Sequence, residues 1–398
     1  MDMANTSIKL DDKFNIKKSN VLLNGTQGLV RLMLGQKLRD EKQGLNTAGF
    51  VTGYRGSPLG AVDFQMRRAS KELLASNIKF KEALNEDLAT TALWGAQQAE
   101  LRGEGLYDGV FGLWYGKGPG VDRSGDAMRH ANMAGSSVNG GVLMAMGDDH
   151  SGESSTVLHQ SDLAMIDAGM PILSPAGVQE ILDYGYYGFA LSRYSGLWVG
   201  LKTMKDTIEV TSVVDGDPFR MEFKNPETMS ASDNLNIRLV DTPADQEKRL
   251  LSDKKTAAED FARINRIDKV GLPKLNSKIG LVAAGKNWLD LIHALSLLGI
   301  DESEAKALGI TSYKIVQTWP IDRQSLLEWA DQLDLIIVIE EKRKIIETQI
   351  KEALFSIASK TRVYGGHKND EYLFFDHGVL DPLDIASALG QIFKEEGC

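Results

Sequence analysis

The stretch AGFVTGYRGSPLG, residues 48–60, decides the fold. Its first residues form a short apolar run that is typical of a buried strand, and the glycines that follow allow the chain to turn where that strand ends. Ser57 and Pro58 then indicate a helix start, with Ser57 as N-cap and Pro58 in the first helical position. Strand, turn and helix in this order predict the opening of a βαβ unit.

The same alternation extends on both sides of this stretch, from about residue 20 to residue 225. Further buried strands are predicted at 108–116, 140–147, 170–177 and 196–203. Helical periodicity predicts helices at 25–42, 58–76, 86–102, 125–135, 154–168 and 177–194. Because strands that alternate with helices favour a parallel sheet, we expect residues 1–225 to form one α/β domain.

The second half of the chain repeats this pattern on a smaller scale. Residues 226–275 are charged, helical in period and bounded by prolines, which predicts a helical connector. Strands are then predicted at 278–285, 311–319 and 333–341, and helices at 287–299, 323–333 and 343–358. We therefore expect a smaller α/β domain over residues 276–360, followed by a tail at 361–398 with a possible strand and a short last helix.

Composition excludes several classes of protein. The 398 residues contain 45 Lys and Arg against 55 Asp and Glu, so the net charge of −10 argues against nucleic-acid binding. No apolar run approaches the ~20 residues that a membrane span needs. The single cysteine, Cys398, excludes a disulfide framework, a Cys-ligated zinc site and an iron–sulfur cluster held by this chain alone, and it suggests the cytoplasm.

Common nucleotide-binding fingerprints are absent. The sequence GKGPGV, residues 116–121, lacks the third glycine of a dinucleotide-binding loop. Residues 280–287 have the glycine and lysine spacing of a P-loop, but Asn287 replaces the Ser or Thr that would hold magnesium. The middle of that segment also has the pattern of a strand, whereas a P-loop needs a loop there.

The turn at residues 53–60 is the first candidate site. Gly53 and Gly56 allow a ligand to come close to the backbone, and Arg55 between them is placed to bind a carboxylate. The alternative is an ordinary capped turn of an α/β protein, which the motif alone favours slightly.

Residues 85–100, NEDLATTALWGAQQAE, form the second candidate site. Asn85 is predicted to be the N-cap, which puts Glu86 in the first helical position. The small residues that follow at helical spacing predict a closely packed face, made of Leu88, Ala92, Gly95, Ala96 and Ala99. Taken alone, Glu86 is explained more simply as an acidic residue that complements the helix dipole.

Two polar loops complete the candidates. Residues 114–132 contain a glycine-rich loop, GPG at 118–120, before a helix that we expect to begin near Asp122 or Ser124. Residues 147–162 collect four Asp or Glu and two His side chains at 148–162, so a metal site is conceivable. No ligand spacing is fixed, however, and a hydrogen-bonded polar loop is the favoured interpretation.

Taken in their order, these loops resemble the pyrimidine-binding domain of the thiamine-diphosphate-dependent 2-oxoacid:ferredoxin oxidoreductases, and most closely the large fused indolepyruvate:ferredoxin oxidoreductases. The resemblance covers about residues 20 to 395, and the second unit is similar to transketolase C-terminal domains. The matching motifs are the GY-x-G-[TS]-P turn at 53–58, the N-E-x-x-A helix start at 85–89, the GPG sequence at 118–120, Met-Arg-His at 128–130 and the DD-to-SS loop at 148–155.

The resemblance implies roles for these residues. Glu86 would be the catalytic acid that bonds N1′ of the cofactor's aminopyrimidine. Arg55 and Ser57 would bind the 2-oxoacid, although the separate-subunit relatives have proline where this chain has Arg55. The residues implied in cofactor binding are Gly53, Gly56, Asn85, Gly118 and Gly120.

The resemblance also implies an enzyme that oxidatively decarboxylates a 2-oxoacid, with indolepyruvate or another aryl pyruvate expected, to an acyl-CoA. Thiamine diphosphate with Mg²⁺, coenzyme A, [4Fe-4S] clusters and ferredoxin would take part. This sequence has no G-D-G motif followed by Asn to hold magnesium and diphosphate. We therefore expect a fragment or subunit that is inactive alone and assembles, as a dimer, with diphosphate-binding and gamma-type domains or subunits.

Two other interpretations stay open from the sequence. One is a non-oxidative thiamine enzyme of the transketolase type, against which the loops at 53–60 and 147–162 argue. The other is a non-catalytic assembly or regulatory subunit that keeps only the fold and its dimer surface. The sequence does not decide which 2-oxoacid is used.

Overall fold

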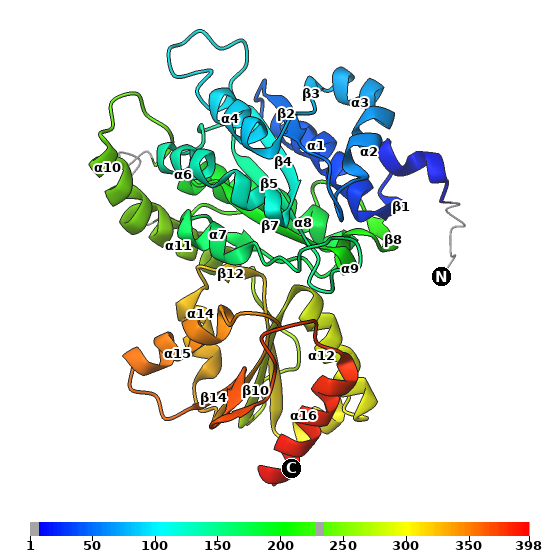
Figure 1. Cartoon of the computed structure of the whole chain (residues 1–398), viewed down its shortest axis with the longest axis vertical. Helices are drawn as coiled ribbons and strands as arrows, with labels where there is room; N and C mark the ends of the chain where they lie inside the picture. Colours follow the sequence, from blue (N-terminus) through cyan, green and yellow to red (C-terminus); the bar gives the residue numbers. More distant parts are fainter. Residues whose placement is uncertain (1–7, 228–234, 398) are drawn as a thin grey trace.

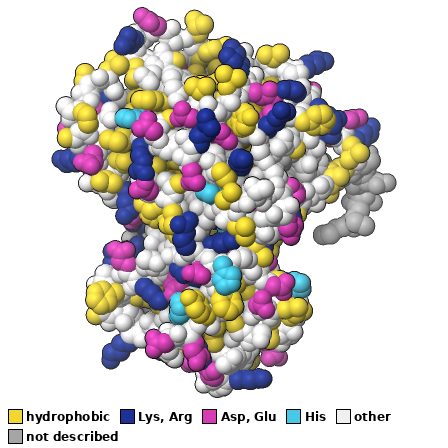
Figure 2. Space-filling model, viewed as in Figure 1, with side chains coloured by type: hydrophobic (Ala, Val, Ile, Leu, Met, Phe, Trp, Pro, Cys, Tyr) yellow, Lys and Arg dark blue, Asp and Glu magenta, His cyan; other side chains and the backbone are white. Residues whose placement is uncertain are grey.

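The computed structural model of the chain describes residues 8–227 and 235–397. Two bodies, each built around its own sheet, lie one above the other along the longest axis (Figure 1). Part of the predicted connector, residues 228–234, and Cys398 lie outside the described residues. Figure 2 shows that the molecule narrows between the two bodies and that acidic and basic side chains are interspersed on the face in view.

The larger sheet has seven strands in the order β12-β6-β7-β5-β4-β2-β3. Its strands are β2 (Ala48–Gly53), β3 (Ile78–Phe80), β4 (Val110–Lys117), β5 (Val142–Asp148), β6 (Ile172–Leu173), β7 (Val199–Met204) and β12 (Gln317–Trp319). Neighbouring strands are parallel, except that β12 pairs with β6 in the antiparallel sense. The predicted parallel α/β sheet is confirmed, with one edge strand supplied by the second half of the chain.

Alternate residues of the central strands enter two separate cores. On β4, Leu113 and Tyr115 pack with α1 (Gly25–Lys42) and α8 (Val178–Ser195), which cover one face of the sheet. Trp114 points to the other face. That face is covered by α4 (Glu86–Ala96), α6 (Gly125–Ala134) and α7 (Asp162–Asp167). This period of two places a sheet buried on both faces between helical layers.

The smaller sheet has five strands in the order β14-β13-β10-β11-β9. Its strands are β9 (Lys269–Val270), β10 (Ile279–Ala284), β11 (Ile310–Ile315), β13 (Leu335–Ile339) and β14 (Arg362–Tyr364). Helices α12 (Gly285–Leu297) and α16 (Pro382–Glu395) cover one face, and α14 (Arg323–Ala330) and α15 (Ile346–Ser356) cover the other. The second predicted α/β unit is therefore present.

The remaining elements are short and lie around these layers. They are η1 (Leu10–Phe14), β1 (Asn20–Asn24), α2 (Val62–Arg68), α3 (Ser70–Ala75), α5 (Gly118–Arg123), α9 (Lys205–Ile208), β8 (Thr211–Asp215), α10 (Pro243–Lys248), η2 (Arg249–Lys254), α11 (Lys255–Asn265), α13 (Glu302–Ala307), β15 (His367–Lys368) and β16 (Glu371–Tyr372). Strand β1 pairs with β8 outside the larger sheet. None of the described helices combines the length and apolar composition that crossing a membrane requires.

Several predicted elements have other bounds because side chains redirect the backbone. The predicted helix at 86–102 ends at Ala96, after which buried Gln97 bonds Val110 O (2.7 Å) and the N–H of Ser137 (3.0 Å). The predicted strand at 311–319 divides into β11 and β12, since Val316 N donates to Asp268 (2.7 Å) between the two sheets. Tertiary contacts of this kind override local periodicity.

Candidate functional site

The candidate site lies where β2 and β4 end. These strands are parallel and in register, with Gly53 opposite Tyr115. The turn after β2 and the GPG sequence after β4 therefore meet at the same edge of the sheet. In open parallel sheets, ligands bind outside this carboxyl edge.

Glu86 begins α4 as predicted. The Asn85 side chain caps the helix by accepting the N–H of Leu88 at 2.8 Å. The Glu86 carbonyl accepts from Trp114 Nε1 (3.1 Å) and from Thr90 Oγ1 (3.0 Å). The residue is only 5% exposed. Within residues 8–227 and 235–397, no hydrogen bond or ion pair involves its carboxyl group, which is uncommon for a residue with so little exposure.

Gly120 lies directly against this carboxylate. A Cβ added at Gly120 would lie 2.5 Å from Glu86 Cγ and 2.6 Å from Glu86 Oε1, closer than any side chain could be accommodated. The structure thus brings together two residues that were singled out from separate motifs. Gly118 lies two residues before Gly120 in the same segment. A Cβ added at Gly118 would overlap the imidazole of His159.

The prediction of a glycine-rich loop at 118–120 is wrong, because these residues form the first turn of α5. Pro119 occupies an early helical position, where its fixed φ suits a helix and its missing N–H costs nothing. The helix expected near Asp122 or Ser124 is therefore two consecutive helices, α5 and α6, with Ser124 between them.

The turn after β2 also differs from its prediction. Helix α2 begins at Val62, so Ser57 is not its N-cap and Pro58 is not in its first position. Pro58 and Leu59 are buried beneath Gly147 at the end of β5, where a Cβ added at Gly147 would lie 3.0 Å from each. This packing holds the chain in turns up to Ala61 and delays the helix.

The structure leaves the polar groups of that turn available. Arg55 is exposed and Ser57 is half-buried, and neither side chain makes a hydrogen bond or ion pair with another described residue. Gly53 lies against Tyr115, and a Cβ added at Gly56 would lie 2.9 Å from Lys117 Cδ. No hydrogen bond or ion pair joins this turn to Glu86 in the part of the chain that is described.

The prediction that Leu88 and the small residues of α4 form a closely packed face is wrong. The buried residues of α4 are Glu86, Ala89, Thr90 and Leu93. The face with Leu88 is instead open, because that side chain is 47% exposed and nothing lies within 4 Å of a Cβ added at Gly95. Together with β3 and the segment before α4, this face lines a groove of about 930 Å³.

The polar loop after β5 is held by its own two aspartates. Asp148, which is fully buried, accepts from Ser161 Oγ (2.6 Å) and from Ser161 N (2.9 Å). Asp149 accepts the backbone N–H groups of Gly152, Ser154 and Ser155. Burial raises the pKa of Asp149, but the hydrogen bonds outweigh burial and place it at about 2. The expected helix at 154–168 is therefore reduced to α7 at 162–167, since Asp149 holds the first residues as a loop.

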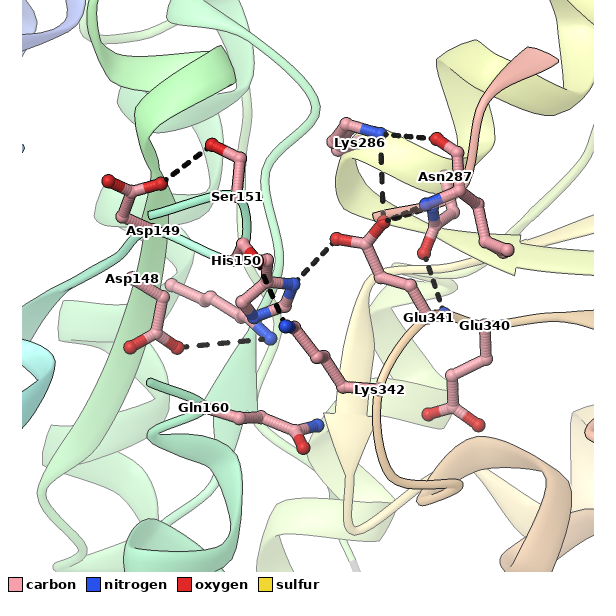
Figure 3. Close-up of polar contacts among 12 residues, drawn as sticks. Asp148, Asp149, His150, Ser151, Gln160, Lys286, Asn287, Glu340, Glu341 and Lys342 are labelled. Carbon is pink, nitrogen blue, oxygen red and sulfur yellow. Dashed lines mark hydrogen bonds and ion pairs between the residues drawn. The ribbon is translucent and has the colours of Figure 1, made fainter. Parts of the chain in front are cut away.

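Across the boundary between the bodies, this loop meets the end of β13. Figure 3 shows His150 and Glu341 pointing toward each other, and His150 Nδ1 lies 2.6 Å from Glu341 Oε1. Lys342 donates to the His150 carbonyl (2.9 Å), and Arg343 N donates to Gln160 Oε1 (3.2 Å). Burial raises the pKa of Glu341, but His150 and Lys286 outweigh burial and place it at about 2.

Sequence reasoning missed this contact between the bodies. Its one local signal is the run of charges that directly follows the apolar strand β13, in the sequence VIEEKRK at 338–344. Only the docking of the two sheets shows that Glu341 and Lys342 face inward. A polar cavity of about 50 Å³ lies beside them, lined in part by His150, Lys202 and Lys286.

Comparisons with known proteins agree with this architecture. A sequence model described as the indolepyruvate oxidoreductase domain matches residues 269–398. The chain is 25% identical over 364 residues to indolepyruvate oxidoreductase subunit IorA of Pyrococcus horikoshii, covering 90% of this chain and 51% of that protein. It is 23% identical over 325 residues to the subunit of the same name from Methanothermobacter marburgensis, covering 80% of this chain and 47% of that protein. The chain spans about half the length of the curated relatives it matches.

Two solved structures share the fold. The 2-oxoglutarate:ferredoxin oxidoreductase of Magnetococcus marinus superposes with a TM-score of 0.65 at 14% identity, covering 94% of this chain and 66% of that one. A split-gene transketolase, described as an inactive beta4 tetramer, superposes with a TM-score of 0.55 at 13% identity and covers 92% of this chain and 98% of its own. Together with the order of motifs along β2, α4 and α5, these matches show that the chain is similar in sequence to indolepyruvate oxidoreductase subunits and similar in fold to a 2-oxoacid:ferredoxin oxidoreductase.

Proposed function

We propose that this chain supplies the pyrimidine-binding part of a thiamine-diphosphate site in an enzyme that oxidatively decarboxylates indolepyruvate or another aryl pyruvate. The observation that carries the proposal is the Glu86 carboxylate, which is buried at a helix start without a partner among the described residues. The names of the sequence relatives, indolepyruvate oxidoreductase subunit IorA, support the choice of substrate class.

The residues around Glu86 fit an aminopyrimidine. A buried carboxyl without a partner can share a proton with a ring nitrogen, and Gly120, which has no side chain, lets α5 lie directly against that carboxyl. Asn85 fixes the start of α4 through its cap and so holds the Glu86 side chain in place. When bound, thiamine diphosphate supplies the electron sink for decarboxylation of the 2-oxoacid.

Arg55 and Ser57 bind the substrate in this proposal. Arg55 presents an unpaired guanidinium at the carboxyl end of β2, where it can form a bidentate contact with the carboxylate of a 2-oxoacid. Ser57 offers a hydroxyl to the oxo group. Gly53 and Gly56 allow the turn to lie close to Tyr115 and Lys117, so this loop keeps its shape while it contacts a ligand.

The other parts of the enzyme would come from further domains or subunits. We assign the diphosphate and Mg²⁺ to a diphosphate-binding part, and coenzyme A, the [4Fe-4S] clusters and the contact with ferredoxin to gamma-type and electron-transfer parts. Iron–sulfur clusters need several cysteines, and this sequence has one. In this proposal the chain is inactive alone, assembles as a dimer and works in the cytoplasm.

The test is reconstitution with the polypeptides encoded beside this chain. The complex should reduce a viologen acceptor with indolepyruvate, and the reaction should require coenzyme A and thiamine diphosphate. Transfer of a two-carbon unit between sugars without reduction of the acceptor would favour the transketolase-type alternative. Absence of thiamine-diphosphate binding by the complex would favour a non-catalytic assembly subunit.

A further inference from the structure

His159 links the polar loop after β5 to helix α5. Its Nε2 lies 2.7 Å from Asp122 Oδ2 on α5. On the other side of the ring, Nδ1 lies 3.5 Å from Asp148 Oδ1 and 3.3 Å from Ser161 Oγ. The side chain is 13% exposed, so these contacts surround most of the imidazole.

The hydrogen bonds around His159 require protons on both ring nitrogens. Asp122 and Asp148 are carboxylates and can only accept. The Ser161 hydroxyl already donates to Asp148 Oδ1 at 2.6 Å, so it accepts from Nδ1. Both Nδ1 and Nε2 therefore donate, which is the bonding pattern of an imidazolium.

The surrounding charges agree with this protonation state. Burial lowers the pKa of His159, but the hydrogen bonds that it donates to Asp148 and Asp122 outweigh burial, and the net shift is upward. Lys202 lies behind Asp148, with its Nζ 4.0 Å from Oδ2, and His150 and Lys342 also act electrostatically on Asp148. Lys202 is itself paired with Asp162 at 2.5 Å. One imidazolium thus stands between two carboxylates.

His159 contacts both ends of α5. Its ring packs on Gly118, the first residue of the helix, so closely that no side chain fits there. Its Nε2 bonds Asp122 near the end of the helix. Gly120 lies between these two contacts and is the residue that packs on the Glu86 carboxylate. The position of α5 against Glu86 is therefore set in part by His159.

The loop that carries His159 is anchored near both of its ends, and at the far end Arg343 N donates to Gln160 Oε1 (3.2 Å). Asp149 closes the beginning of the loop by accepting from Gly152 and Ser154. The second body holds the same loop through the pair of His150 with Glu341, as Figure 3 shows. An anchored loop can transmit its position to α5, whereas a free loop could not.

We propose that His159 is a positioning residue, which, as an imidazolium between Asp122 and Asp148, holds α5 so that Gly120 stays against the Glu86 carboxyl. The cofactor part of this inference rests on the proposed function, because it predicts tighter binding of thiamine diphosphate when His159 is protonated. The link between the charge of His159 and the position of α5 does not depend on any cofactor.

The first test uses the full chain without cofactor. Side-chain ¹⁵N NMR should show His159, assigned with His159→Asn, titrating above the ordinary histidine pKa of 6.5, and Asp122→Asn should move that pKa down. The amide resonance of Gly120 should titrate with the same midpoint. The proposal would be overturned if His159 were neutral below pH 6.5. It would also be overturned if the chemical shift of the Gly120 amide did not change as His159 titrates.

The second test measures thiamine-diphosphate affinity of the assembled enzyme across pH by calorimetry. His159→Gln should weaken binding on the order of tenfold below pH 6.5, because misplacement of α5 moves the Glu86 environment. The ratio of variant to wild-type Kd should approach one as pH rises through the His159 pKa. Ionisation of the cofactor affects both Kd values equally, so it does not change this ratio. A ratio that does not depend on pH would mean that the ring only fills space and would overturn the positioning role.

The matched control is His377→Gln, which makes the same substitution at a histidine beside an aspartate (His377 Nδ1 to Asp376 Oδ1, 3.7 Å) in the exposed tail. It should leave the affinity and its pH profile unchanged. If the wild-type complex does not bind thiamine diphosphate at any pH, the proposed function fails and so does the effect of His159 on the cofactor. The NMR titration still decides whether His159 holds α5.

Discussion

Buried glutamates stand at the carboxyl edge of both sheets, but only in the larger sheet is one left without partners. In the smaller sheet, Glu340 accepts the N–H groups of Ile345 and Ile346 (3.0 and 2.9 Å), and Glu341 is bonded by His150 and by Leu380 N. Glu86, at the edge of the larger sheet, has no such bonds to the described residues. Burial of a carboxylate therefore does not by itself mark a functional site.

The largest expected effect is at Glu86. Glu86→Gln keeps the shape but removes the proton that the proposed chemistry needs, and general acid–base groups contribute about 10²–10⁴-fold. In the assembled enzyme, kcat and the C2–H exchange of bound thiamine diphosphate should fall by at least about a hundredfold. Circular dichroism and thermal unfolding should not change.

The matched control is Asp87→Asn, one residue along α4. Its side chain points about 100° away around the helix, so activity should stay near that of the wild type. Near-normal C2–H exchange in Glu86→Gln would return this residue to an ordinary helix-start acid and remove the contrast between the two sheets.

The partnered glutamates should matter for stability instead of catalysis. Glu341→Gln leaves His150 without its charged partner, whereas Lys286 keeps Asp290 at 2.7 Å. The substitution should lower the free energy of unfolding by about 2 kcal/mol at pH 7, measured by urea denaturation. Glu340→Gln is the internal control. Burial raises the pKa of Glu340 to about 7, since its N–H bonds only partly offset burial, so Gln resembles its protonated form and should cost less.

Acid should remove what Glu341 contributes. Its pKa is depressed from 4.5 to about 2, so its stabilisation is present above pH 4.5 and is lost as pH falls toward 2. The difference in unfolding free energy between the wild type and Glu341→Gln should therefore shrink over this range. A difference that stays constant with pH would show that the charge of Glu341 is not the cause.

Gly120→Ala tests the contact beside Glu86 by adding one carbon. The new Cβ would meet Glu86 Oε1 at 2.6 Å, so the carboxyl or α5 must shift. Thiamine-diphosphate affinity should fall on the order of tenfold. Gly125→Ala is the matched control, because nothing lies within 4 Å of a Cβ added there. Equal affinities for the two variants would separate Gly120 from the cofactor site.

Arg55→Ala should have an effect of similar size to that of Gly120→Ala, but it should act on the substrate alone. The expected change is a rise in KM for the 2-oxoacid of about tenfold, the loss of one charge-assisted contact, without a change in cofactor affinity. Steady-state kinetics at saturating thiamine diphosphate checks this. The opposite pattern would reassign the turn at 53–58 to the cofactor.

Local patterns predicted most of the elements that carry the candidate site. Helix α1 has the predicted bounds, and Asn85 caps α4 with Glu86 in its first position, because side-chain periodicity and capping act over a few residues. The failures are non-local. Ser57 did not cap a helix because Pro58 is held beneath Gly147, and Leu88 faces a groove although its spacing favoured burial.

The role of His159 and Glu341 could not be predicted from sequence for the same reason. Their partners are contributed by distant segments, since Asp122 precedes His159 by 37 residues and His150 precedes Glu341 by 191. Charged residues after a strand are typical of an exposed loop, and only the packing of the two sheets shows which of them are paired.

Strand β12 has a consequence for synthesis of the chain. It is made after the first three strands of the smaller sheet, β9, β10 and β11, yet it closes the β6 edge of the larger sheet. While the ribosome is still adding residues before 317, β6 presents unpaired backbone groups, which is the kind of edge that recruits other chains. The larger sheet can therefore finish folding only after the chain has grown to residue 319, and a piece cut at residue 275 would keep this edge open.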